Sequence, residues 1–94
     1  YFAAIDAIDS DFEKREALVA LIRSDAPDLA RSRAVLSAVG RIDSDFERRE
    51  VLQALAAVMP NDATLIEDFR GVARRMSDFE RAEAEKALDR FHRG

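Results

Sequence analysis

A repeated phrase constrains this 94-residue chain more than any other feature. Residues 8–18 read Ile-Asp-Ser-Asp-Phe-Glu-Lys-Arg-Glu-Ala-Leu, and residues 42–52, at an offset of 34, read Ile-Asp-Ser-Asp-Phe-Glu-Arg-Arg-Glu-Val-Leu. A shorter copy, Met-Ser-Asp-Phe-Glu-Arg-Ala-Glu-Ala, occupies 76–84 at an offset of 33. A period of this length is typical of one supersecondary unit repeated, usually a pair of helices that stacks on the next pair.

Each copy of the phrase has the form of a capping box at the start of a helix. The Ser side chain can accept from the backbone N–H three residues on, and the Glu at that position can reach back to the Ser N–H. The acidic first turn suits the positive end of the helix dipole. We therefore predict three structural caps: Ser10 with Glu13, Ser44 with Glu47, and Ser77 with Glu80.

The apolar spacing and the scarcity of Gly and Pro predict an all-α fold. The helices that follow the boxes are expected to bury Phe12, Phe46 and Phe79 in equivalent places. A second set of helices lies between them, one with Pro27 in its first turn and one with Asn61 as its N-cap. The expected helices cover roughly 1–8, 11–24, 27–41, 45–59, 62–75 and 78–92.

We predict that these helices form a single helical-repeat domain over 1–94. Its architecture is a right-handed α-solenoid-like stack of helical hairpins with a period of about 34 residues. The parts are a partial repeat at 1–9, a repeat at 10–43, a repeat at 44–76 and a C-terminal capping helix at 77–94.

The third copy replaces apolar residues of the earlier copies with charged ones. Glu85 stands where Leu52 stands in the second copy, Asp89 where Ala56 stands, and Arg70 where Leu36 stands. A terminal repeat faces water on the side that an internal repeat buries against its neighbour. The array is therefore expected to end at residue 94 and, because Tyr1 falls in mid-helix, to be cut open at its N-terminal side.

Other charged residues also recur with the period. Glu positions repeat once per copy, as do Lys or Arg positions two residues earlier: Glu16, Glu50 and Glu83, and Lys14, Arg48 and Arg81. A ladder of salt links between neighbouring repeats is the preferred interpretation, because successive repeats pack about 10 Å apart.

No residue pattern points to catalysis, to a metal or to a cofactor. The chain has no Cys. The Asp residues around Ser10 and Ser44 lack the further ligands of a calcium loop and lie at electropositive helix starts. His92, the single histidine, has neither a nucleophile nor an orienting partner. We therefore expect a non-enzymatic chain with no catalytic residue, no metal site and no cofactor.

A basic cluster is the one candidate binding feature. It consists of Arg70, Arg74 and Arg75, with Arg31, Arg33 and Arg41 on the preceding helix. Arginine suits carboxylate and phosphate groups, so an acidic peptide or a phosphate could bind there. Basic side chains near helix C-termini are also favourable in themselves, and that alternative stays open.

Charge and hydropathy narrow the range of partners. The net charge of −4 argues against a general nucleic-acid binder, which needs a basic face. No apolar run approaches the roughly 20 residues that span a bilayer, so no membrane insertion of this segment is expected. We expect a monomer that binds a protein or peptide. The alternatives are a structural spacer, or a regulatory domain that binds an anionic ligand at the Arg cluster.

The phrase at 8–18 and 42–52 resembles helical repeats with an Ile-x-Ser-Asp-(Tyr/Phe)-Glu signature. Such repeats are associated with the C-terminal parts of bacterial membrane sensor-transducers of the M56 zinc-peptidase type. The resemblance implies a HEAT-like α-solenoid on the non-catalytic side of a bacterial regulatory or sensor protein. The His-Glu-x-x-His motif is absent, so no zinc activity carries over.

Overall fold

The computed structural model describes residues 10–92, which are helical outside the turns. The helices are α2 at Asp11–Ser24, α3 at Leu29–Val39, α4 at Asp45–Val58, α5 at Ala63–Ala73 and α6 at Asp78–Phe91. No strand occurs within 10–92, and the all-α prediction is confirmed. The predicted helix at 1–8 and the partial repeat at 1–9 lie outside the described residues.

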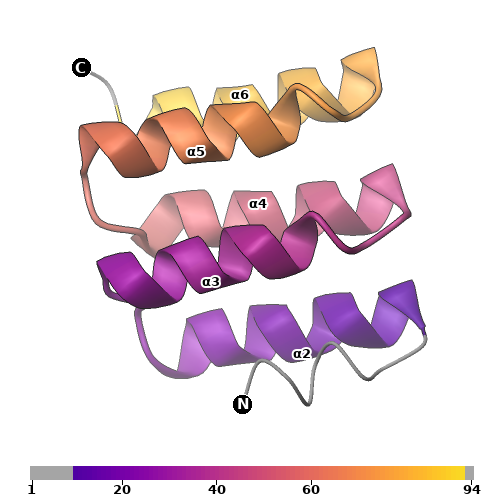
Figure 1. Cartoon of the computed structure of the whole chain (residues 1–94), viewed down its shortest axis with the longest axis horizontal. Helices are drawn as coiled ribbons and strands as arrows, with labels where there is room; N and C mark the ends of the chain where they lie inside the picture. The colour runs from indigo at the N-terminus through magenta and orange to yellow at the C-terminus, as the bar shows by residue number, and fades with distance from the viewer. Residues whose placement is uncertain (1–9, 93–94) are drawn as a thin grey trace.

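The helices of this part form two layers (Figure 1). In the A layer, α2 contacts α4 and α4 contacts α6; in the B layer, α3 contacts α5. The chain alternates between the layers through short turns, and α3 and α5 also pack on the A-layer helices that follow them. Helices of one layer therefore run in the same direction and place their equivalent ends together.

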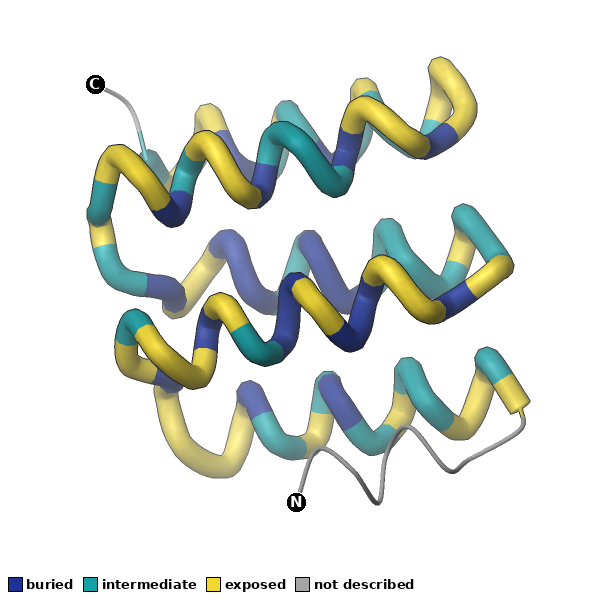
Figure 2. The backbone as a smooth tube through the Cα atoms, in the orientation of Figure 1, coloured by how far each residue is buried: buried dark blue, intermediate teal, exposed yellow. Residues whose placement is uncertain are grey.

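The core lies between the two layers, where the buried positions face inward (Figure 2). Each A-layer helix contributes apolar residues one turn apart, such as Leu52 and Leu55 with Ala56 in α4. Phe69 of α5 is the largest fully buried side chain among the described residues. Burial of such side chains stabilises the fold by about 1.5–3 kcal/mol each.

The predicted burial of the three repeated phenylalanines is wrong. Phe12, Phe46 and Phe79 are 55%, 49% and 64% exposed. The reason is helical geometry: nine residues separate Phe46 from the buried Leu55, which is about two and a half turns at 3.6 residues per turn. The two side chains therefore point to opposite sides of α4. The phenylalanines are alike in position, but that position lies outside the core.

The second half of the predicted capping box is also wrong. The Glu47 N–H donates to Ser44 Oγ at 3.4 Å, as expected, and Glu13 N–H does the same with Ser10. The Ser44 N–H, however, donates to Asp11 Oδ2 of the preceding A helix at 3.0 Å, not to Glu47. Ser77 occupies an N-cap position without a side-chain capping bond.

The same link recurs at the next junction of the A layer. There the Ser77 N–H donates to Asp45 Oδ2 at 2.9 Å. In the first two copies, the Asp that directly follows the N-cap Ser thus accepts from the backbone at the start of the next A helix. The N-terminal ends of α2, α4 and α6 are fastened to one another in series.

A ladder of arginine–glutamate pairs runs beside these links. Arg15 Nε donates to Glu47, and Arg49 Nε lies 3.0 Å from Glu80 Oε2. The guanidinium groups of Arg15 and Arg49 stack over Phe12 and Phe46, each 4.8 Å from the ring centroid. The sequence predicts a ladder of this kind, but from the recurring Lys14, Arg48 and Arg81 with Glu16, Glu50 and Glu83. The exposed phenylalanines therefore cover the ladder arginines.

The charges around Arg15 favour the charged form of its guanidinium in the pair with Glu47. Burial by itself would lower the pKa of this guanidinium. The hydrogen bond and the charge of Glu47, together with the charges of Glu16 and Glu50, outweigh burial and raise the pKa above its ordinary value.

The B-layer helices begin at aspartates. Asp28 Oδ1 accepts from Arg31 N–H at 2.8 Å, and Asp62 Oδ1 accepts from Leu65 N–H at 2.9 Å. The predicted cap at Asn61 is wrong by one residue, because Asp62 is the cap. The predicted place of Pro27 in the first turn is wrong by two residues, because α3 begins at Leu29. Pro27 is buried just before the Asp28 cap and does not belong to α3.

The last A helix differs from the other two at its charged positions. Arg70 of α5 faces Asp89 of α6 at 3.7 Å, where the earlier copy has Leu36 and Ala56. Glu85 lies 3.9 Å from Arg81 on its own helix. At the position of the ladder arginines, α6 carries Ala82. The start of α6 is therefore linked to α4 through Ser77 and Glu80. However, α6 lacks the arginine that would form a further arginine–glutamate pair.

Candidate interaction groove

The structure separates the three arginines of the predicted basic cluster. Arg70 pairs with Asp89, and Arg74 lies 3.8 Å from Glu67 of its own helix. Arg75 follows the last turn of α5 and points toward a groove between the B-layer helices. Adjacent side chains of a helix point about 100° apart, so Arg74 and Arg75 serve different faces. The binding role assigned to the cluster stays a prediction.

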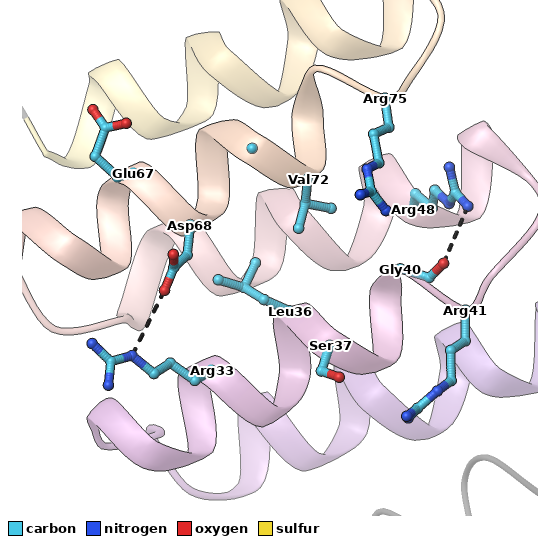
Figure 3. A pocket seen from close by; sticks show the side chains of 11 residues that line it. Arg33, Leu36, Ser37, Gly40, Arg41, Arg48, Glu67, Asp68, Val72 and Arg75 are labelled. Carbon is cyan, nitrogen blue, oxygen red and sulfur yellow. Dashed lines mark hydrogen bonds and ion pairs between the residues drawn. The ribbon is translucent and has the colours of Figure 1, made fainter.

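The groove lies between α3 and α5 and holds about 600 Å³ (Figure 3). This volume falls within the range of about 300–1,000 Å³ that is typical of ligand pockets. Its middle is formed by Leu36 and Ser37 of α3 with Gly71 and Val72 of α5. Leu36 is buried and Val72 half-buried, so the middle of the groove is apolar.

Three arginines lie at the end of the groove where α3 and α5 terminate, and Arg41 points away from Arg48 and Arg75 (Figure 3). Arg41 and Arg75 occupy equivalent places, each two residues beyond the last residue of its B helix. Arg48 comes from the first turn of α4 and donates to the carbonyl oxygens of Ile42 and Gly40, the latter at 3.4 Å. Arg48 is therefore held in place by backbone groups beyond the end of α3 and by Asp45 of its own helix, whose Oδ1 lies 3.5 Å from a terminal nitrogen.

The opposite end carries two carboxylates (Figure 3). Asp68 lies 3.7 Å from Arg33, and Glu67 lies 3.8 Å from Arg74. The Arg33 and Asp68 side chains are 47% and 50% exposed. Exposed pairs of this kind contribute about 0–1 kcal/mol, so little holds α3 to α5 along this edge.

Gly71 is the most unusual residue of the lining. It lies inside α5, where Gly costs about 0.5–1 kcal/mol relative to Ala. Its backbone needs no left-handed conformation, and a Cβ built on it would meet no atom within 4 Å. Neither backbone geometry nor packing within the described residues accounts for a glycine here. The effect of the missing side chain is that the α5 backbone stays open to the groove.

The outer face of the A layer has two smaller hollows. One lies between α2 and α4 and holds about 410 Å³; the other lies between α4 and α6 and holds about 530 Å³. Gln53 of α4 lines both. At the end of α6, His92 Nε2 lies 2.8 Å from Ala56 O, close enough to tie the two helices together. Residues 10–92 contain no group of His, Cys, Asp or Glu that could hold a metal ion.

The comparisons add no relative to this picture. No protein-family model, curated protein or solved structure matches the chain. None of the helices in the described part combines the length and apolar character that a membrane crossing requires.

Proposed function

We propose that this chain is a non-enzymatic, monomeric protein-interaction module that presents its B layer to a protein or peptide. In this proposal the helices form a right-handed, HEAT-like α-solenoid-like stack with a period of about 34 residues. The parent is a larger bacterial regulatory or sensor protein of the M56-type class that the repeated phrase resembles. The observation that carries the interaction function is the groove between α3 and α5.

The support for a stack comes from equivalent contacts at successive junctions. Asp11 accepts from Ser44 N–H at the first junction, and Asp45 accepts from Ser77 N–H at the second. The support for an interaction surface comes from the B layer. Charged side chains that do not belong to the core line its groove. The α5 backbone is open at Gly71, and no contact among the described residues requires a glycine there.

A peptide-library selection tests the interaction function against the spacer alternative. The wild-type chain is immobilised and challenged with a random peptide library, and the Gly71→Leu variant serves as the matched counter-target. A Cβ at position 71 meets no atom within 4 Å, so a leucine side chain there can extend into the groove and fill it. Peptides that enrich on wild type and not on the variant support the proposal. No enrichment, or equal enrichment on both, supports a spacer.

A further inference from the structure

We infer that the groove takes an acidic peptide segment, with a carboxylate at the Arg41, Arg48 and Arg75 end and an apolar side chain over Leu36 and Val72. This inference rests on the proposed interaction function and names the class of partner and its orientation.

The first argument is charge contrast. The chain as a whole carries a net charge of −4, but the groove is lined by four arginines and only two carboxylates. The two carboxylates lie at one end, beside Arg33 and Arg74. The other end carries three arginines against one carboxylate, Asp45, which lies 3.5 Å from Arg48, so positive charge is in excess there. Complementary potential of this kind selects a partner by charge and speeds its association.

The second argument is the availability of donors. Within residues 10–92, the Arg75 side chain has no hydrogen-bond or ion-pair partner. Arg48 spends Nε and one terminal nitrogen on backbone carbonyls, and its other terminal nitrogen lies 3.5 Å from Asp45 Oδ1, which fixes the direction of its guanidinium. The available guanidinium of Arg75 suits a carboxylate, because arginine can donate two parallel hydrogen bonds to it.

The third argument concerns the backbone of the partner. The missing side chain at Gly71 lets a bound chain approach α5 closely, and Ser37 is small at the equivalent place on α3. The apolar residues Leu36 and Val72 adjoin these two positions in the middle of the groove. A peptide therefore fits better than a bare anion, which would use the arginines and leave the apolar middle uncovered.

The test is fluorescence anisotropy with three labelled peptides of one length. The probes are Glu-Leu-Glu-Ser-Glu-Leu, its Gln version and its Lys version. The acidic peptide should bind most tightly, and its affinity should fall as salt is added, because Arg41 and Arg75 are exposed to solvent. Arg75→Glu should weaken binding of the acidic peptide about tenfold or more, the effect of losing a charge-assisted contact and adding repulsion.

The matched control is Arg74→Glu, which changes charge by the same amount one residue away. Arg74 does not line the groove, and its partner Glu67 lies at the acidic end, away from the bound carboxylate, so this variant should leave the affinity within about twofold, the range of a screened surface charge. Gly71→Leu is the second variant and should abolish binding by filling the groove. Circular dichroism of each variant checks that the helices are intact.

Several results would overturn the inference. They are equal binding of the Glu and Gln peptides, equal losses in Arg74→Glu and Arg75→Glu, no binding of any probe, and displacement of the peptide by an equimolar amount of inorganic phosphate. The library selection separates this failure from failure of the interaction function. Groove-dependent peptides without acidic residues would keep the interaction function and reject the acidic partner.

Discussion

The A layer and the B layer join their helices in different ways. In the A layer, every junction combines buried apolar residues, an Asp-to-backbone hydrogen bond and an arginine–glutamate pair. In the B layer, α3 and α5 are joined by the exposed Arg33–Asp68 pair, whose charged atoms lie 3.7 Å apart. The A layer can therefore supply the cohesion of the array, and the B layer is left free to keep an open groove.

The largest expected difference in the free energy of unfolding lies between a substitution in the core and one in the groove. Leu55 in α4 is fully buried, whereas Val72 in α5 is half-buried beside the groove. Leu55→Ala should lower the free energy of unfolding by about 2–5 kcal/mol, because it leaves a cavity. Val72→Ala should cost about 1 kcal/mol or less, since the site is already open. Urea denaturation measures both, and equal losses would mean that the groove floor is as closely packed as the core.

The second comparison sets a rung of the ladder against the B-layer pair. Arg49 and Glu80 are 3.0 Å apart with side chains only 16% exposed, and Arg49 also stacks on Phe46. Arg49→Gln should cost about 1–3 kcal/mol, because it leaves the largely buried Glu80 carboxylate without its charged partner. Arg33→Gln removes an exposed pair and should change stability by about 0.5 kcal/mol or less. If the two variants unfold at the same urea concentration, the ladder does not hold the A layer together.

The third comparison concerns the helix N-caps, where the B layer has the shorter hydrogen bond. The B-helix cap at Asp62 accepts from Leu65 N–H at 2.9 Å, whereas the A-helix cap at Ser44 accepts at 3.4 Å, a long hydrogen bond. Asp62→Ala should cost about 1 kcal/mol and Ser44→Ala only about 0.5 kcal/mol, the low end of the range for N-caps. A larger loss in the serine variant would show that its hydroxyl is a strong cap after all.

The starts of the A helices could be predicted from sequence because capping is local. Ser10, Ser44 and Ser77 precede helices that begin where the repeated phrase indicates. The partners of the phrase could not be predicted in the same way. Glu47 was assigned to the nearest backbone N–H, but in the stacked structure Arg15 of the preceding helix is the partner. A contact across 32 residues depends on how the helices pack, and local rules do not contain that information.

The three arginines of the predicted basic cluster do not lie together, for a related reason. Nearness in sequence grouped Arg70, Arg74 and Arg75, although their positions on α5 direct them to different neighbours. The signal that could have found the groove was the repeat offset itself. Arg41 and Arg75 are 34 residues apart, as are Ser37 and Gly71, and the structure places both pairs along one groove. The period therefore predicts which residues lie together better than sequence proximity does.

The smallest expected effect distinguishes two glycines of the B layer. Neither Gly40 nor Gly71 has a positive φ, so alanine is compatible with both backbones. A Cβ at Gly71 meets nothing within 4 Å, whereas at Gly40 it comes within 3.3 Å of Ser37 O. Gly71→Ala should therefore raise the free energy of unfolding by about 0.5 kcal/mol, because alanine loses less chain entropy on folding.

Gly40→Ala is the matched control and should give no such gain, because its methyl group crowds the end of α3. Thermal unfolding followed by circular dichroism resolves the pair when both variants are run beside wild type. A stabilised Gly71→Ala that binds the acidic peptide more weakly would show that stability is sacrificed for an open groove. A Gly71→Ala variant no more stable than Gly40→Ala would mean that the methyl group meets an obstacle in the groove, and the argument for a close backbone approach there would fail.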